Sequence, residues 1–233
     1  MYRTNTRPLQ AAANIALIPA NQQGYNHAGD LTFDPKSVST DATRGQPRVL
    51  LPLECYYPKK NPSNTCGTGG IAVADPVSLK ASYSVNLAGV PKAMWAEITP
   101  DSKSVLTSNG TQLVAYDAAL ITATAAGGTI SPTKYLNVVL PSGNVTGAAF
   151  YQNRLFLSLN LGTTFTVVSY DMGADFISPT GSATTEITVT RSSSNNEPEG
   201  LAVTPPVLGS YPLAGALHWQ MLPSIPLYSR ILN

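Results

Sequence analysis

Two stretches of the chain decide its predicted fold, because they repeat one order of strands and turns. Residues 92–117 read KAMWAEITPDSKSVLTSNGTQLVAYD, and residues 146–171 read TGAAFYQNRLFLSLNLGTTFTVVSYD. Each stretch contains a strand of small residues, a polar turn, a second strand, a second turn and a third strand that ends in Tyr-Asp. Asp117 and Asp171 therefore occupy matching places, which predicts two copies of one structural unit.

The same order extends outward from these two copies. Residues 26–75 hold a longer version that closes on Asp75, and residues 199–221 begin another version. One more strand is expected after each Asp ending, at 80–87, 134–140 and 184–190. Four strands at a period of about 50 residues are typical of β-propeller blades. The units are expected over residues 26–91, 92–145, 146–198 and 199–233, the last unit being completed by residues 1–25.

The predicted fold is thus one all-β domain over residues 1–233, a β-propeller of four or five four-stranded blades. The last unit lacks an outer strand, and the N-terminal run at 12–19 is expected to supply it and close the ring. Residues 116–126 are rich in alanine but end in two glycines, which predicts a loop with at most one helical turn. A β-sandwich or another barrel is the alternative, although neither explains the repeated strand order.

Composition excludes several classes of function. Charged residues make up 12% of the chain, against about 25% in average proteins, and the net charge is +1. This balance argues against nucleic acid as a partner, because a nucleic-acid binder would carry a basic stripe. No run of 18 apolar residues occurs, so no membrane span is expected. The first ten residues lack the apolar centre of a signal peptide, and we expect a mature or truncated chain.

The two cysteines, Cys55 and Cys66, flank a segment rich in proline and polar residues. A disulfide between them would close a loop of about a dozen residues and stabilise the fold by about 3 kcal/mol. Two ordinary thiols are the alternative. The low charge and the surface rich in Ser, Thr and Asn favour an oxidising compartment, so the chain is expected to be secreted.

Several segments resemble an uncharacterised family of secreted β-propeller proteins: NHAGD, RVLLPLECYYP, CGTGGIAVADP, KAMWAEITPD, TGAAFY and EPEGLAV with LHWQ. This resemblance implies a fold and secretion rather than a reaction. The EGLAV segment is similar, more loosely, to strand starts of NHL-type and SMP-30/gluconolactonase-like propellers. In the calcium-dependent lactonases among them, a Glu-Gly at such a position places its carboxylate on an axial metal. Glu199-Gly200 matches that pattern.

Acidic residues gather where the four inner strands are expected to begin. They are Asp30, Glu97, Glu197 and Glu199, with His27 beside them. Oxygen ligands that converge on an axis suit Ca²⁺, which takes about six to eight oxygens. We expect Glu199, Glu97 and Asp30 as metal ligands, Glu197 as a ligand-binding residue, and His27 and Glu97 as catalytic candidates. A water-filled polar channel and metal-free acid–base chemistry are the alternatives.

Two tryptophan neighbourhoods complete the candidate site. On a strand, His218 would share a face with Gln220, opposite Trp219. His218 is a candidate ligand-binding residue or base, a structural histidine being the alternative, and Trp219 is expected to pack between blades. Trp95 lies two residues from Glu97 and thus on the same face of a regular strand. It is a candidate platform for a sugar, although a blade interface would look the same.

The usual catalytic motifs are missing, including the nucleophile elbow, the P-loop, the zincin helix motif and the EF-hand loop. Two functions compete. One is an extracellular binding or structural module that recognises a glycan or another surface polymer. The other is a calcium-dependent hydrolase of small molecules, esters or lactones with an axial site. The sequence favours the binding module, because acids are few and no nucleophile motif is present. It leaves the oligomeric state open.

Overall fold

The structure is a computed structural model of the 233-residue chain. It describes residues 25, 27–35, 47–54, 67–77, 80–138, 140–141, 143–192, 196–204, 215–222 and 228–232. These residues form strands almost throughout, with one short helix, so the all-β prediction is confirmed. No helix in these ranges is long and apolar enough to cross a membrane. The predicted N-terminal strand at 12–19 lies outside the described residues.

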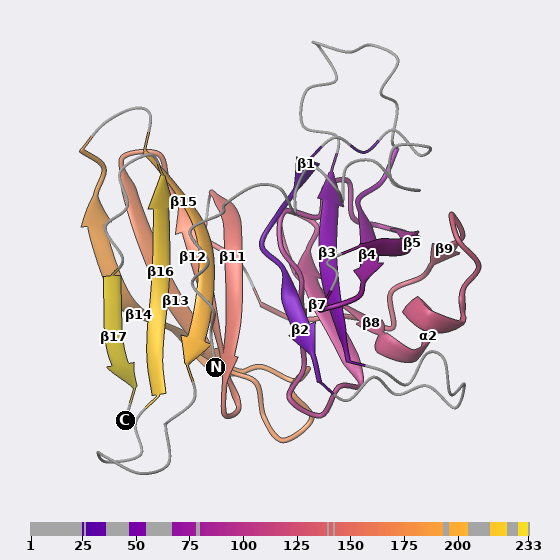
Figure 1. The fold of residues 1–233 in the computed structure, drawn as a ribbon. Helices are drawn as coiled ribbons and strands as arrows, with labels where there is room; N and C mark the ends of the chain where they lie inside the picture. Colours follow the sequence, from indigo (N-terminus) through magenta and orange to yellow (C-terminus); the bar gives the residue numbers. More distant parts are fainter. Residues whose placement is uncertain are drawn as a thin grey trace.

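The first half of the chain forms two sheets, which lie on one side of the molecule in Figure 1. In the first sheet β3 pairs with β1, β2 and β4, and β4 pairs with β5. These strands are β1 (His27–Ala28), β2 (Thr32–Asp34), β3 (Arg48–Glu54), β4 (Gly70–Ala74) and β5 (Ala81–Leu87). The second sheet has the order β10-β8-β7-β6. Its strands are β6 (Glu97–Ile98), β7 (Ser104–Ser108), β8 (Leu113–Asp117) and β10 (Lys134–Tyr135).

The second half forms two further sheets on the other side of the molecule (Figure 1). The third sheet is an antiparallel meander of β11 (Asn144–Tyr151), β12 (Arg154–Asn160), β13 (Thr164–Asp171) and β14 (Thr180–Thr190). The fourth is a meander of β15 (Glu197–Thr204), β16 (Gly215–Leu222) and β17 (Tyr228–Leu232). All four sheets are open, and the described residues show neither a closed ring nor a blade number.

The sheets stack like consecutive blades, because the middle sheets bury both faces. In the third sheet, Leu157 packs against the second sheet. The apolar residues that alternate with it along the strand, such as Phe156, pack against the fourth sheet. Alternate side chains of a strand point to opposite faces, so strands buried on both sides read as continuous apolar runs. Trp219 is fully buried among Phe156 and Phe165, and its Nε1 donates to Ser158 Oγ at 2.9 Å. Trp219 thus packs between the third and fourth sheets, and whether these sheets are blades of a closed propeller stays a prediction.

The aspartates that end the third strand of each repeat share one structural role. The Oδ1 atom of each accepts the backbone N–H two residues further on, which closes an Asx turn and stops the strand. These contacts join Asp75 to Val77 at 3.1 Å, Asp117 to Ala119 at 2.8 Å, and Asp171 to Gly173 at 3.1 Å. The repeat seen in the sequence is thus a repeat of turn chemistry.

The segment after Asp117 differs from the expected loop. Asp117 caps helix α2 (Ala118–Ala123), and the chain then forms β9 (Thr129–Ile130), which pairs in parallel with β5 of the first sheet. The fourth strand of this unit was expected over 134–140 but covers only Lys134–Tyr135. The N–H of Val138 donates to the carbonyl of Leu136, a turn that takes the chain out of the ladder.

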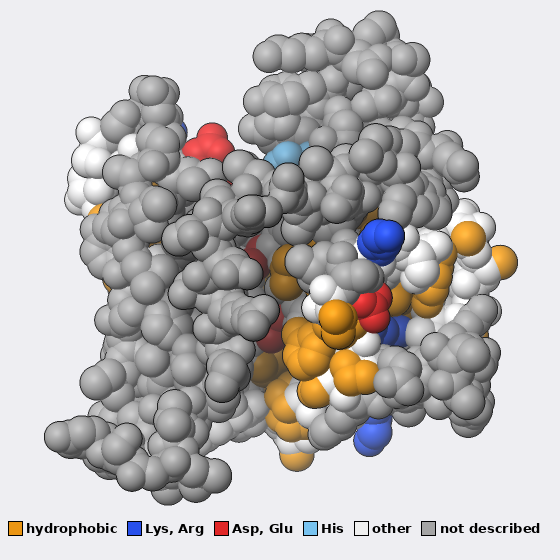
Figure 2. All heavy atoms as spheres, viewed as in Figure 1, with side chains coloured by type: hydrophobic (Ala, Val, Ile, Leu, Met, Phe, Trp, Pro, Cys, Tyr) orange, Lys and Arg blue, Asp and Glu red, His pale blue; other side chains and the backbone are white. Residues whose placement is uncertain are grey.

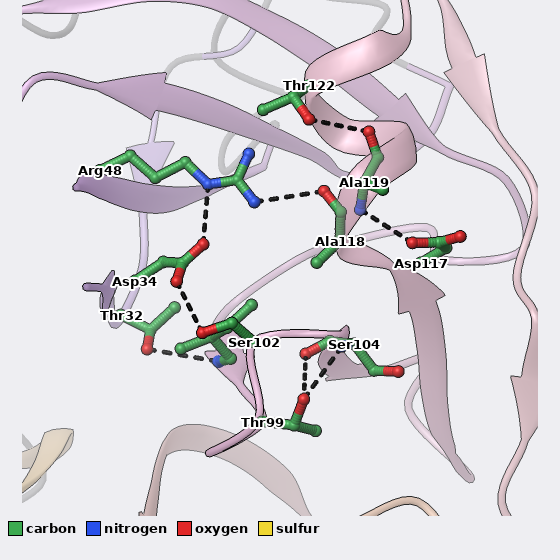
Figure 3. Close-up of polar contacts among 11 residues, drawn as sticks. Thr32, Asp34, Arg48, Thr99, Ser102, Ser104, Asp117, Ala118, Ala119 and Thr122 are labelled. Atoms are coloured by element: carbon green, nitrogen blue, oxygen red, sulfur yellow. Dashed lines mark hydrogen bonds and ion pairs between the residues drawn. The ribbon is translucent and has the colours of Figure 1, made fainter. Parts of the chain in front are cut away.

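A buried ion pair connects the first sheet to this segment (Figure 3). Arg48 donates from Nε to Asp34 Oδ2 at 3.0 Å and from Nη2 to the carbonyl of Ala118 at 3.2 Å. Ser102 donates to the other oxygen of Asp34 at 2.8 Å. The side chains of Arg48 and Asp34 are 4% and 0% exposed, so the charges of the pair are compensated by protein groups such as these.

Candidate functional site

The inner strands of the four sheets lie side by side, and two of them carry a β-bulge at the same place. β11 packs beside β15 and beside β6, and β6 packs beside β2. The register shifts between Val145 and Gly147 in β11 and between Pro198 and Gly200 in β15. A bulge adds one residue and re-aims its side chain. Thr146 and Glu199 are therefore equivalent positions at the start of their strands.

Asp30 joins the inner strands of all four sheets. Its own N–H donates to the carbonyl of Met94 at 3.0 Å, and its carbonyl accepts the N–H of Ala96 at 3.1 Å. Its Oδ2 atom accepts the N–H of Ala148 at 3.1 Å and the N–H of Leu201 at 3.2 Å. One residue of the first unit thus contacts the second unit through its backbone and the third and fourth units through its side chain.

Two glycines make room for this carboxylate. A Cβ on Gly147 would lie 2.7 Å from Asp30 Oδ2 and 2.9 Å from the nitrogen of Leu201. A Cβ on Gly200 would lie 2.9 Å from Asp30 Oδ1. Each distance is shorter than a real Cβ contact, so glycine is required at both positions for the close approach.

Asp30 and Glu97 are carboxyl groups with raised pKa values. Burial raises the pKa of Asp30 to about 7, against the opposing effect of its two N–H donors. Burial likewise raises the pKa of Glu97 to about 8, although Glu97 hydrogen-bonds to Thr32 and accepts the N–H of Phe150 at 3.0 Å. Both acidic side chains connect inner strands, and neither lines the cavity described next.

A cavity of about 130 Å³ opens where the inner strands begin, and we call it the junction pocket. All four units contribute to its lining: His27, Gly29 and Glu54 from the first, Met94 from the second, Asn144, Thr146 and Asn160 from the third, and Glu197, Pro198 and Glu199 from the fourth. Figure 2 shows a histidine and acidic side chains between the two groups of sheets. No aromatic side chain of a described residue lines this pocket.

Glu54 is the most enclosed acid of the junction pocket. Its side chain is 1% exposed, and Oε1 lies 2.8 Å from Nδ1 of His27, the residue opposite it in the β1–β3 register. The Oε2 atom is buried and has no hydrogen-bond partner among the residues that the structure describes. The hydrogen bond with Glu54 raises the pKa of His27, more than its partial burial lowers it.

Glu197 and Glu199 form the other acidic side of the pocket. Glu197 is exposed and Glu199 is half-buried. Burial raises the pKa of Glu199, and the charge of Glu197 and a hydrogen bond to that residue raise it further. The pocket therefore holds three glutamates and one histidine, and none of its described lining residues is Lys or Arg.

The structure separates the predicted site residues into groups. His27, Glu197 and Glu199 line the junction pocket, whereas Asp30 and Glu97 lie among the inner strands. Trp95 is fully buried between the second and third sheets, and its Nε1 donates to Ser108 Oγ at 3.2 Å. Trp95 therefore has no exposed face on which a sugar could stack. It packs in an interface between sheets, which is the alternative that the sequence left open for this residue. The side chain of His218 lies outside the described part of the chain, as do Cys55 and Cys66.

Sequence reasoning missed four polar lining residues, namely Glu54, Asn144, Thr146 and Asn160. Glu54 carried a usable signal, because it ends the apolar run RVLLPLE, in which every residue of β3 is buried. A glutamate at the end of such a strand is unusual unless it is paired. The two asparagines gave no such signal, since they begin β11 and end β12 in a sequence rich in polar residues.

The predicted calcium ligands do not gather around one point. Asp30 and Glu97 each use a carboxylate oxygen to bind backbone N–H groups, and only Glu199 of the three lines the pocket. Among the described residues, no three His, Cys, Asp or Glu side chains are grouped closely enough to hold a metal ion. Calcium binding stays a prediction that the experiments below include.

No protein-family model matches the sequence, and no curated protein matches it. Solved structures show a distant likeness. The chain is similar to the propeller of Dos1, with a TM-score of 0.43 and 11% identity over 83% of this chain and 38% of that one. It is also similar to the hydrazine synthase of Kuenenia stuttgartiensis, with a TM-score of 0.39 and 11% identity over 73% of this chain and 40% of that one. The chain thus spans less than half the length of either protein.

Proposed function

We propose that this chain is an extracellular binding module of the propeller type, which recognises a glycan or another surface polymer by enclosing one of its sugar residues in the junction pocket. One observation carries the proposal: all four repeat units contribute to a single polar cavity at the point where their inner strands begin. Ligand sites are concave and combine few, well-placed polar groups from distant parts of a chain.

The lining chemistry supports a hydroxyl-rich ligand. The amide of Asn144 can donate and accept, and the carboxylates of Glu197 and Glu199 accept. Asn160 can donate from Nδ2, since its Oδ1 accepts the N–H of Gly162 at 3.0 Å. These are the partners that sugar hydroxyl groups need. Because Trp95 and Trp219 are buried in the sheet interfaces, recognition would depend on hydrogen bonds rather than on stacking. The cavity is small, which suits one ring of a polymer.

Binding is favoured over hydrolysis because the buried acids already have structural partners. Asp30 and Glu97 hold the inner strands together, and His27 is paired with Glu54. The extracellular part of the proposal rests on the low charge of the chain and on the predicted Cys55–Cys66 disulfide, whose residues lie outside the described part of the chain.

A glycan array tests the proposal, with bound glycans then titrated by calorimetry against variants. We expect Glu199→Ala and Asn144→Ala to weaken binding by about tenfold each, since each removes a hydrogen-bonding group that lines the pocket. Asp171→Asn is the matched control, because it also removes one negative charge and keeps the oxygen that closes the turn at Gly173. Asp171 pairs with Arg154, which begins β12, whereas Asn160 of the pocket ends β12 about 20 Å away.

Two results would contradict the proposal. One is an array on which no glycan binds the folded protein. The other is turnover of a lactone or ester panel that EDTA abolishes, which would favour the calcium-dependent hydrolase instead. The same panel, run with and without added Ca²⁺, also tests the calcium prediction.

A further inference from the structure

We propose that the sugar residue bound in the junction pocket carries a protonated amine, so that the ligand is an amino-sugar glycan. This inference rests on the proposed function above and names the chemical class of its ligand. It starts from charge, because Glu54, Glu197 and Glu199 face a single histidine in the described lining of the pocket. A neutral sugar would leave this negative charge without a counter-ion.

The second argument is the orphaned oxygen of Glu54. The side chain lies in the pocket wall with 1% of its surface exposed, and no described residue hydrogen-bonds to Oε2. Buried carboxylate oxygens in native proteins are nearly always bonded, so such an atom marks a place where a donor is missing. His27 already occupies Oε1, which leaves Oε2 for a donor from the ligand.

A third argument comes from the glutamate pair at the start of β15. Glu197 and Glu199 both line the pocket, and two carboxyl groups so close favour either a proton on one of them or a cation between them. An ammonium group of the ligand would replace that proton. Glu54 and the Glu197–Glu199 pair are therefore both suited to a cationic hydrogen-bond donor from the ligand.

An ammonium group fits these acids better than a metal ion does. It has three N–H donors, each reaching an acceptor at about 2.7–3.2 Å, and one carboxylate together with neutral acceptors such as amide or hydroxyl oxygens can satisfy them, so it does not need several acids around it. A calcium ion needs its oxygens at about 2.3–2.6 Å from one centre. The described residues contain no group of three acids or histidines arranged in that way. Asn144 and Asn160 remain for the hydroxyl groups of the same sugar ring.

The experiment compares two oligosaccharides of equal length: a β-1,4-linked glucosamine tetramer and its fully N-acetylated counterpart. Calorimetry at a slightly acidic pH, where the amines are protonated, measures both against the full chain. We expect the amine form to bind at least about tenfold tighter, because hydrogen bonds between charged groups are about twice as strong as neutral ones. We expect added salt to weaken this binding.

Variants locate the effect in the pocket. Glu54→Gln and Glu199→Gln should each weaken binding of the amine form by about tenfold or more and leave the N-acetylated form within about threefold. Asp171→Asn, the control of equal charge, should leave both within about twofold. Thermal melting checks that each variant is folded. If Glu54→Gln fails to fold, Glu199→Gln and Glu197→Gln carry the test, since both positions reach solvent.

The outcomes separate the two proposals. Equal binding of both tetramers, with loss in Glu199→Ala, would overturn the amine inference and keep the glycan module. Binding of neither tetramer, while another neutral glycan binds on the array, would have the same result. Binding of no glycan at all would overturn both proposals. Saturable Ca²⁺ binding that depends on Glu54 and Glu199, without binding of the amine tetramer, would overturn the inference in favour of a metal site.

Discussion

Asp30 and Leu201 are 171 positions apart, yet Oδ2 of Asp30 accepts the backbone N–H of Leu201 at 3.2 Å. The same oxygen accepts the N–H of Ala148, and the backbone of Asp30 pairs with the chain around Trp95. Each sheet is a local meander that forms from neighbouring strands. The order in which the sheets stand beside one another is held at their inner strands, and Asp30 contacts all of them.

Replacing Asp30 by alanine should destabilise the fold strongly. The change leaves the N–H groups of Ala148 and Leu201 without an acceptor, and each buried orphan costs about 1–3 kcal/mol. Asp30→Asn keeps one acceptor oxygen, so it should cost far less. Urea unfolding of both variants measures the difference, and equal midpoints for alanine and asparagine would contradict the role of the side chain.

The stability of the fold should decrease as the pH rises from about 4 to about 8. The folded pKa values of Asp30, about 7, and Glu97, about 8, lie above the unfolded values of about 3.9 and 4.3. Between these limits the folded state binds more protons than the unfolded state, so raising the pH favours unfolding. Well above pH 8 both groups are ionised in either state, and their contribution to the curve should level off.

Two variants assign this pH dependence to its groups. Asp30→Asn should remove the part of the stability change that occurs between pH 4 and 7. Glu97→Gln should remove the part that extends to pH 8. Denaturant midpoints measured across the range check this. Glu199 and His27, whose pKa values are also raised, lower the stability in the same direction and should leave a residual slope when both variants are combined. Asp101 and Asp175, whose pKa values are lowered, act only at more acidic pH. A wild-type protein that gains stability from pH 5 to 8 would show the sign to be wrong.

Alanine at either glycine beside Asp30 should destabilise the fold. The added Cβ at Gly147 would meet both the Asp30 carboxylate and the backbone of Leu201, and that at Gly200 would meet the carboxylate. Forcing such contacts apart costs about 1–3 kcal/mol. Gly67→Ala is the control, because a Cβ there has nothing within 4 Å. Thermal melts that fall equally for all three variants would contradict the close-approach explanation.

Removing Arg48 alone should cost more than removing its whole ion pair. Arg48→Met leaves the carboxylate of Asp34 buried with Ser102 as its remaining side-chain partner among the contacts described above, and breaking a buried pair costs about 3–5 kcal/mol. The double variant Arg48→Met with Asp34→Leu should recover part of the loss, since no charge is then buried. A double-mutant cycle measured in denaturant checks the sign of this coupling.

The disulfide between Cys55 and Cys66 stays a prediction. If it forms, the intact mass should rise after reduction and alkylation but not after alkylation alone. Replacing both cysteines by serine should then lower the free energy of unfolding by about 3 kcal/mol. Two thiols that react with iodoacetamide without prior reduction would refute the bridge.

The strand order could be read from the sequence because its causes are local. Alternating and continuous apolar runs mark strands, and Asp75, Asp117 and Asp171 mark where the third strands stop. β9 escaped prediction for the opposite reason. Thr129 and Ile130 form a strand only because the edge of β5 offers them partners, a contact between two different repeat units.

The sequence by itself determined the all-β class, the repeat and the clustering of acids at the starts of the inner strands, since each of these depends on residues close together in the chain. Only the tertiary structure decided how those acids are used. Asp30 and Glu97 accept backbone N–H groups of other units, and Trp95 is buried between sheets. Glu54, at the end of β3, lines the junction pocket together with Glu199. A side chain's role depends on which partners reach it, and here those partners come from units far away in the chain.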